Sequence, residues 1–218
     1  MTADKRGLFD VIAPYYGLFF NFQVKYYQKI LNRVAQELDE VNYKNIIDVG
    51  CGTGALCYVL NRQGLSVTGV DAEPGMLKIA EKKLQNSPVC LVQADAFGKL
   101  PFNDKSFDVA ISSYVIHGMP AARREIFYTE MNRIARYKVI FHDYNDKRSF
   151  LTSLVEWLEK GDYFNFIKQA KKEIADNFKD LRVVQVDKRA AWYICTPFNT
   201  ETEKSQRVTS LLYNITSY

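Results

Sequence analysis

The 218-residue sequence has few cysteines and no long hydrophobic run. Its four cysteines, Cys51, Cys57, Cys90 and Cys195, form no CxxC pair and have no histidine at metal-ligand spacing, so neither a disulfide framework nor a zinc site is expected. No stretch approaches the roughly 18–20 uncharged apolar residues that span a bilayer, and the first residues lack the apolar centre of a signal peptide. These absences favour a soluble, cytoplasmic protein.

Neither sign of charge is in large excess. The 29 Lys and Arg residues stand against 25 Asp and Glu, and the two signs interleave, so no basic stripe for nucleic acid is visible. Aromatic residues are numerous by contrast, with 14 Tyr and 14 Phe, and many of them gather in residues 9–27 and 157–166. They could line a pocket for an apolar ligand, although core packing is the default explanation.

Short β-branched runs alternate with helical segments between about residues 44 and 144. This alternation predicts parallel pairing in a doubly wound α/β sheet. Strands are expected at Asn45–Val49, Leu65–Val70, Val89–Gln93, Phe107–Ser112 and Lys138–His142. Helices are expected at Ala55–Arg62, Pro74–Gln85 and Ala121–Ala135.

Further elements flank this core. Apolar positions at helical spacing between Val24 and Leu38 predict an amphipathic helix, and a helical region interrupted by Gly161 is expected over Phe150–Phe178. Two strands, Arg182–Val186 and Trp192–Thr196, should form an antiparallel hairpin because their connection is short. We expect a single domain with a helical cover at 1–43, a core at 44–144, a helical insertion at 145–180, a hairpin at 181–198 and a tail at 199–218.

A glycine-rich turn joins the first expected strand to the first core helix. It reads DVGCGTG over residues 48–54. Glycine permits positive φ and a close approach of the backbone to a ligand, whose polar end then faces helix-terminal amides. Asp71 follows the end of the second expected strand, where a carboxylate can reach ribose hydroxyls. The pattern therefore predicts a site for a nucleoside-containing cofactor.

Two classes of cofactor use this geometry. Gly50, Gly52 and Ala55 satisfy the G-x-G-x-x-G/A pattern of dinucleotide binding, which keeps an NAD-type oxidoreductase as an alternative. Against it, Asp48 precedes the loop, a further glycine follows, and a second acid suited to an adenine amine ends the third strand. The segment LPF at residues 100–102, followed by FDV at 107–109, also has no role in a nicotinamide site. A binding module without catalysis is the third possibility.

Taken together, these residues resemble the class I S-adenosylmethionine-dependent methyltransferases, in particular the methyltransferase type 11 branch similar to the quinone-biosynthesis C-methyltransferases. The resemblance covers residues 9–143, where IIDVGCGTG, VTGVDAEPGML, VQADAFGKLPF and FDVAISSYVIHGM are similar to four family motifs in order. FDVIAPYY resembles the family's opening segment, although Gly17 replaces the usual acid. The resemblance implies a seven-stranded, mostly parallel Rossmann-like sheet and methyl transfer to a small-molecule acceptor, and the aromatic segments suit an apolar or aromatic one.

The resemblance also implies roles for individual residues. Gly50, Gly52 and Gly54 would approach the methionine part of the cofactor, and Asp48 would orient their loop. Asp71 would accept both ribose hydroxyls, with a solvated loop acid as the alternative. The adenine would meet Asp95 through its amine and the Ala96 amide through a ring nitrogen, with Ala72, Met76 and Phe97 beside the base. Core packing explains Met76 and Phe97 equally well, and the cofactor-binding set is completed by Cys51 and Ser112.

Some positions depart from the family pattern. The segment 133–137 lacks the proline-and-double-glycine turn that usually precedes the fifth strand, at the edge of the sheet remote from the cofactor. Ser112–Val115 differs from the Pro-Pro-aromatic motif of the base-amine methyltransferases, which disfavours methylation of nucleic-acid bases.

Two histidines complete the candidates. His117 follows the fourth expected strand at the carboxyl edge of the sheet, where ligands bind in open α/β folds. It could act as a general base or contact the substrate, or it could be structural. His142, Asp143 and Asn145 could suggest a metal cluster, but a metal-dependent methyltransferase would also want an acid where this chain has Ser112, so no metal is expected.

Overall fold

The computed structural model describes residues 19–39, 43–145, 163–200, 202–203 and 205. The expectations for residues 9–18, 150–162 and most of the tail lie outside these ranges. The chain forms two compact units, of which the first comprises Met1–Pro101 and Phe107–Ser113 and the second Phe102–Ser106 and Tyr114–Tyr218. The expected arrangement as a single domain with cover segments stays a prediction.

Seven strands form a sheet in the order β3-β2-β1-β4-β5-β7-β6, which confirms the predicted α/β fold. In the first unit, β1 pairs in parallel with β2 and β4, and β2 with β3. In the second unit, β7 pairs antiparallel with β5 and β6, so the predicted hairpin is present. The bounds of the strands are β1 Asn45–Val49, β2 Ser66–Asp71, β3 Cys90–Gln93, β4 Phe107–Ser113, β5 Ala135–Tyr144, β6 Asp180–Gln185 and β7 Ala190–Thr196.

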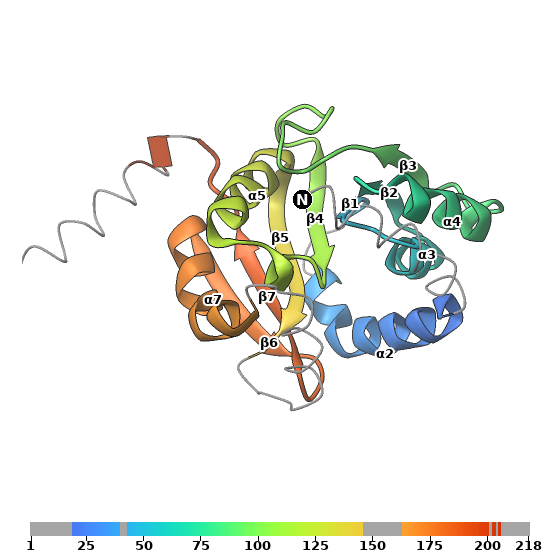
Figure 1. The fold of residues 1–218 in the computed structure, drawn as a ribbon, viewed down its shortest axis with the longest axis horizontal. Coiled ribbons are helices and arrows are strands. Elements are labelled where there is room, and N and C mark those ends of the chain that lie inside the picture. The colour runs from blue at the N-terminus through green and yellow to red at the C-terminus, as the bar shows by residue number, and fades with distance from the viewer. Residues whose placement is uncertain (1–18, 40–42, 146–162, 201, 204, 206–218) are drawn as a thin grey trace, which may run out of the picture. The chain divides into compact units, whose positions relative to one another are not determined.

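Three described helices belong to the first unit: α2 (Phe20–Asp39), α3 (Ala55–Arg62) and α4 (Pro74–Leu84) (Figure 1). α3 follows the glycine turn and buries its apolar face, from Ala55 to Leu60. Pro74 opens α4 at a position where no backbone amide is needed. α2 packs against α3, and its backbone departs from helical geometry at Val34.

The second unit is built on aromatic side chains between its helices and β5. α5 (Ala121–Ile134) and α7 (Tyr163–Asn177) pack against each other, and the single 3-10 turn η1 (Ile116–Gly118) contacts both α7 and β5. Phe141 on β5 lies 5.2 Å from the Tyr128 ring and 5.7 Å from the Phe178 ring, measured between centroids. The edge-to-face arrangement of these rings stabilises the core beyond simple burial.

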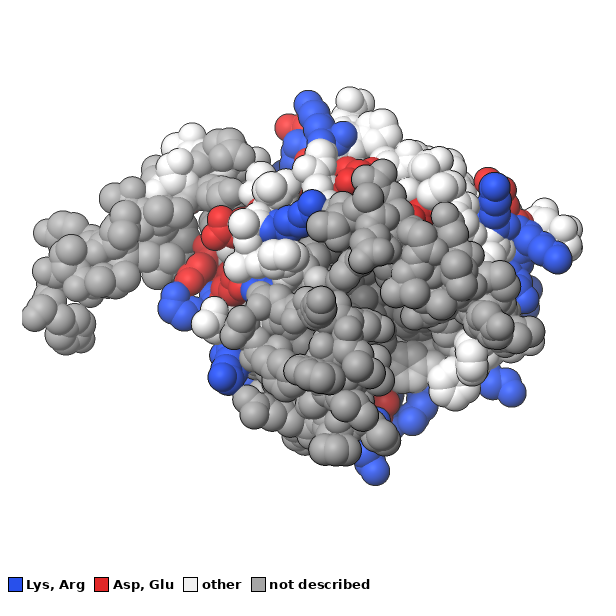
Figure 2. Space-filling view, viewed as in Figure 1, with Lys and Arg blue, Asp and Glu red and all other residues white. Residues whose placement is uncertain are grey.

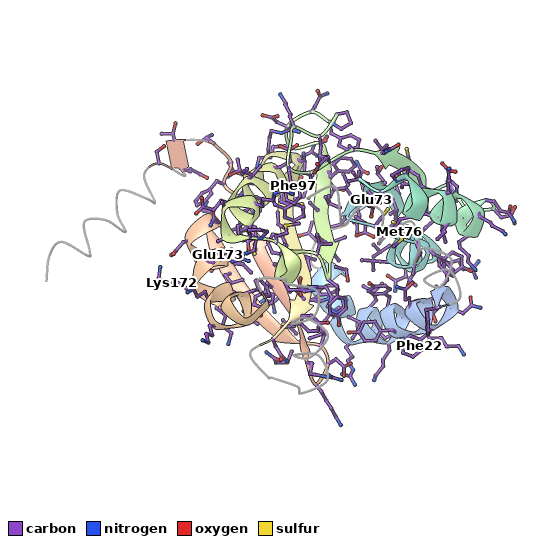
Figure 3. The ribbon with its side chains drawn as sticks, in the orientation of Figure 1. Phe22, Glu73, Met76, Phe97, Lys172 and Glu173 are labelled. Carbon is purple, nitrogen blue, oxygen red and sulfur yellow. The ribbon has the colours of Figure 1, made fainter. Side chains whose placement is uncertain are left out.

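A buried ion pair joins the two helices of this unit. The Arg124 side chain, 1% exposed, contacts Glu173 on α7 through Nε at 2.6 Å and Nη2 at 2.8 Å. Glu173 is labelled in Figure 3. Such a bidentate pair is costly to break, because one charge would remain buried without its partner. It therefore fixes α7 on α5.

The short segment Phe102–Ser106 is held to the second unit by side chains of α5. Arg133 donates to the Phe102 carbonyl at 2.8 Å and to Asp104 at 2.7 Å. The Lys105 ammonium donates to the Asn132 carbonyl at 2.8 Å. This segment is therefore fixed by charge-assisted hydrogen bonds although it has no regular secondary structure.

β5 is longer than the sequence predicts, since it begins at Ala135 instead of Lys138 and continues to Tyr144. Its first positions carry the exposed side chains of Arg136 and Tyr137, and these conceal the apolar run that identifies a buried strand. Among the described helices, none combines the length and the apolar character needed to cross a bilayer.

Candidate cofactor-binding site

The glycine turn of the first unit has an unusual backbone. Gly50, Gly52 and Gly54 all have positive φ, at 82°, 54° and 77°, which side chains other than glycine rarely tolerate. The amides of Gly50 and Cys51 both donate to the Val70 carbonyl, at 2.8 and 2.9 Å. The turn is therefore held against the end of β2.

Asp71 connects the end of β2 to this turn directly. Its Oδ2 accepts a hydrogen bond of 2.7 Å from the Gly52 amide, and its Oδ1 accepts one of 2.9 Å from the Glu73 amide. Burial raises the pKa of Asp71, while the backbone hydrogen bonds act in the opposite direction. A carboxylate oxygen offers more than one lone pair, so both oxygens keep acceptor capacity for hydroxyl groups.

Asp48 carries a buried carboxylate with unused hydrogen-bonding capacity. The residue is 1% exposed, and its Oδ2 accepts from the Cys57 thiol at 3.3 Å. Its Oδ1 has no hydrogen-bond partner among the described atoms. Burial raises the pKa of Asp48 to about 7. A buried acceptor without a donor is costly, so a ligand that supplies a donor here would be favoured.

Two of the three glycines have different surroundings. A Cβ added to Gly52 would meet no atom within 4 Å, so space is open beside this backbone position. A Cβ on Gly54 would lie 2.6 Å from Cδ1 of Leu84 in α4. Gly52 is therefore the position that a ligand can approach, whereas Gly54 lets the start of α3 pack against α4.

The residues expected around the adenine differ in how far they are buried. Met76, at the start of α4, is buried, while Phe97 is half-buried and Ala72 exposed. Figure 3 labels Met76 and Phe97. Asp95 is exposed, and its Oδ1 accepts from the Phe97 amide at 2.9 Å. Its side chain thus already shapes the turn after β3. At the end of β4, Ser112 is 2% exposed and its hydroxyl has no partner among the described atoms.

Sequence reasoning missed two polar side chains of α2 that reach this region. The Thr53 hydroxyl in the glycine turn donates to Oε1 of Gln23 at 2.9 Å, and the Tyr27 hydroxyl is hydrogen-bonded to the Ser113 hydroxyl at 2.9 Å. Burial of the phenol raises the pKa of Tyr27. The spacing of Gln23 and Tyr27, four residues apart on one helix face, is the signal that could have found them.

The two histidines lie in the second unit, and their surroundings differ. Nδ1 of His117 is 2.8 Å from Oδ1 of Asp143, and the His117 side chain is 13% exposed. His142 is 1% exposed, and burial lowers its pKa to about 4. Asn145 donates to Gln185 at 2.7 Å. Asp143 thus contacts His117, which lies 26 positions earlier in the chain. Within residues 19–39, 43–145 and 163–200, no group of three His, Cys, Asp or Glu residues is placed so that it could hold a metal ion.

Residues 47–142 match a protein family described as a methyltransferase domain. This part of the chain, somewhat under half of it, is therefore similar to the methyltransferase domains of that family. A demethylmenaquinone methyltransferase from Thermotoga maritima is 31% identical over 138 residues, which cover 60% of this chain and 56% of that protein. The chain spans about half the length of the curated relatives it matches.

Solved methyltransferase structures share the fold of this domain. A candidate S-adenosyl-L-methionine-dependent methyltransferase from Methanococcus maripaludis superposes with a TM-score of 0.67 at 16% identity, covering 88% of this chain and 94% of that one. The magnesium protoporphyrin IX methyltransferase from Synechocystis, solved with bound S-adenosylhomocysteine, gives a TM-score of 0.61 at 18% identity, covering 79% and 83%. The fold of this chain is therefore the Rossmann-like class I fold.

Proposed function

We propose that this protein binds S-adenosylmethionine and transfers the methyl group to a small-molecule acceptor. The hydrogen bond from the Gly52 amide to Asp71 is the observation that carries the proposal, because it joins an open, positive-φ glycine to a carboxylate at the end of the neighbouring strand. The methyltransferase match over residues 47–142 includes both of them.

The residues of the first unit fit the parts of this cofactor. Gly52 offers space for the methionine part, and the oxygens of Asp71 keep lone pairs for the two ribose hydroxyls. The unpartnered Oδ1 of Asp48 can accept a hydrogen bond from the ligand side of the loop or through a water molecule. S-adenosylmethionine supplies a methyl group on a positively charged sulfur and leaves as S-adenosylhomocysteine.

The chain's own contribution is then mainly to orient the reactants. The cofactor carries its own leaving group, so alignment of the acceptor and exclusion of water should supply most of the rate. Relatives named for demethylmenaquinone and for phthiotriol dimycocerosates support a small acceptor with apolar or aromatic character. On the face shown in Figure 2, Lys and Arg side chains lie in separate groups, several with Asp or Glu nearby, which gives no support to a nucleic-acid acceptor.

Calorimetry with S-adenosylmethionine, S-adenosylhomocysteine and NAD tests the proposal on the full chain. We expect the first two to bind and NAD not to bind. Binding of NAD alone would indicate an oxidoreductase, and cofactor binding without turnover on any acceptor in a metabolite screen would indicate a binding module. Either result would overturn the proposed function.

A matched pair of glycine variants tests the place of binding. Gly52 and Gly64 have positive φ, at 54° and 89°, and a Cβ at either would meet no atom within 4 Å. Alanine should therefore cost about 1 kcal/mol of folding free energy at both positions. Only Gly52→Ala should weaken S-adenosylhomocysteine binding, by tenfold or more, because Gly64 follows α3, away from the glycine turn. Equal affinities in the two variants would contradict the placement of the cofactor.

A further inference from the structure

We propose that Asp143 is a positioning residue that holds His117 as a general base, and that the acceptor is one whose reacting atom loses a proton during methyl transfer. The inference rests on the proposed function and deepens it by naming the acceptor chemistry. It is carried by the contacts around His117 within the second unit.

The Asp143 carboxylate is surrounded by hydrogen-bond donors. Its Oδ2 accepts from the amides of Ile116, at 3.1 Å, and His117, at 3.3 Å. Its Oδ1 accepts from the Tyr144 amide at 2.8 Å and faces Nδ1 of His117 at 2.8 Å. The three backbone amides donate to both oxygens, so the carboxylate serves as a hydrogen-bond acceptor on each side. Nδ1 of His117 is therefore the donor in its contact with Asp143.

This donor role fixes the tautomer of His117. In a neutral imidazole one nitrogen carries the proton and the other accepts, so a proton on Nδ1 leaves Nε2 as the acceptor. Asp143 also accepts from the backbone amide of the same residue, so it holds both the main chain and the ring of His117. An imidazole oriented by a buried carboxylate is the arrangement that stabilises the imidazolium formed when Nε2 takes a proton.

Neighbouring aromatic side chains restrict the ring further. The His117 ring meets the Tyr144 ring edge to face at 4.7 Å between centroids, and the Tyr114 ring lies 6.4 Å away. Tyr114 has a φ of 55°, a conformation that costs a non-glycine residue about 1–3 kcal/mol. Its amide donates to the His142 carbonyl at 2.8 Å, which holds the chain in that conformation directly before η1.

Each element packed near η1 also carries charged or titratable groups among the described residues. From α5, Arg124 donates to the Met119 carbonyl and pairs with Glu173 of α7, so these two charges compensate each other. Tyr128 on α5 has its pKa raised, first by burial and also by the charges of Glu173 and Asp143. From the β6–β7 turn, Asp187 acts on the pKa of His142. Among the described residues, Asp143 is the acid that contacts the His117 ring.

Methyl transfer to such an acceptor releases one proton. The acceptor atom forms a bond to the methyl carbon, the bond between that carbon and sulfur breaks, and its electron pair stays on the sulfur. The proton of the acceptor atom passes to Nε2 of His117 and then to water. A phenol, an acidic C–H or a protonated amine needs this base, whereas a carboxylate or thiolate acceptor does not.

The test uses the fact that the chain has two histidines. Long-range proton–nitrogen NMR on the untagged full chain over a range of pH, with and without S-adenosylhomocysteine, should show that the neutral form of the His117 ring carries its proton on Nδ1. His142 should remain neutral down to about pH 5, because its pKa lies near 4. A neutral His117 with its proton on Nε2 would overturn the proposal, and this readout needs no variant that might fail to fold.

Turnover separates a positioning role from a structural one. With an acceptor found by metabolite screening, the rate should fall below the His117 pKa that NMR measures, and His117→Gln should remove this acid limb and slow turnover by about 10²–10⁴-fold. Asp143→Asn should slow turnover by about 10²-fold or more with unchanged affinity for S-adenosylhomocysteine, while Asp187→Asn, which removes a charge near His142, should not. Identical pH profiles in wild type and His117→Gln would refute the base. Absence of cofactor binding in the wild type would instead refute the proposed function.

Discussion

The hydroxyl of Thr53 in the glycine turn donates a hydrogen bond of 2.9 Å to the side chain of Gln23 in α2. A second bond of 2.9 Å joins Tyr27, one helical turn later, to Ser113 at the end of β4. α2 is therefore attached to the two chain segments that end at the carboxyl edge of the first unit's strands. A ligand that orders the glycine turn should consequently order α2 as well.

Thr53→Val tests this connection, because it removes the hydroxyl and keeps the shape of the side chain. We expect a loss of about 1 kcal/mol in stability and a several-fold weaker affinity for S-adenosylhomocysteine. Trypsin should also cut faster after Lys25, Lys29 and Arg33 of α2 in the variant, and the ligand should slow cleavage in the wild type. Thr68→Val, in the middle of β2, is the control and should leave the cleavage rate in α2 unchanged. Equal cleavage in both variants would show that the bond does not connect loop and helix.

Asp71 should be the acid on which cofactor affinity depends most. A hydrogen bond to a charged carboxylate contributes about 1.5–3 kcal/mol, and Asp71→Ala loses the ribose hydroxyls as well as the Gly52 amide. Calorimetry should show a loss of tenfold or much more for alanine and a smaller loss for Asp71→Asn. Glu81→Gln removes an exposed charge from α4 of the same unit and should bind as the wild type. A change below about twofold in Asp71→Ala, with the circular dichroism spectrum intact, would contradict the ribose assignment.

Affinity for S-adenosylmethionine should depend on pH through Asp48. Its pKa is raised to about 7 by burial, so the free protein binds a proton there at lower pH. A positively charged ligand favours the ionised carboxylate and must displace that proton, so affinity should fall about tenfold per pH unit below 7 and level off above it. Calorimetry between pH 6 and 8 should show this slope, and Asp48→Asn should flatten it. A parallel slope in the variant would assign the proton to another group.

The same carboxyl should make the unliganded protein less stable as pH rises. Because the pKa of Asp48 is higher in the folded than in the unfolded protein, the carboxyl contributes its full stabilisation below the unfolded-state pKa of about 4. This contribution to the free energy of unfolding is lost as pH rises through 7. His142 has the opposite effect, because its lowered pKa makes stability fall as pH decreases from about 6.5 toward 4. The contribution of Asp48 should therefore be visible on its own between pH 6.5 and 8, as a melting temperature that decreases toward the alkaline end.

The sequence predicts most of the fold because the signals are local. The bounds of β1 and α3 agree with the predicted ones, since an apolar run ends at a glycine turn and a helical pattern follows it. The start of β5 was missed because Arg136 and Tyr137 place exposed side chains on a strand that is otherwise buried. Two consecutive exposed residues near the start of a strand fit neither the alternating pattern nor the continuous apolar pattern by which strands are recognised.

The candidate site was predictable only in part. Asp71 and the glycine turn were found because the order of strand, turn and acid lies along the chain. The Gln23–Thr53 and His117–Asp143 pairs join segments 30 and 26 residues apart, so no local pattern contains them. The sequence also grouped Asp143 with His142 as possible metal ligands. Successive residues of a strand point to opposite faces, and Asp143 faces His117 instead.

The attachment of Phe102–Ser106 to Arg133 and Asn132 determines how the protein can be divided. The first unit is interrupted in sequence after Pro101 and continues at Phe107 with β4. Val109, Ala110 and Ile111 of β4 are the register partners of β1. A fragment that stops at Pro101 would expose the edge of β1. A fragment that continues to Ser113 would carry a segment without the Arg133 and Lys105 contacts that fix it. No single cut therefore separates the first unit, and a fusion or domain exchange at one junction would have to carry both units together.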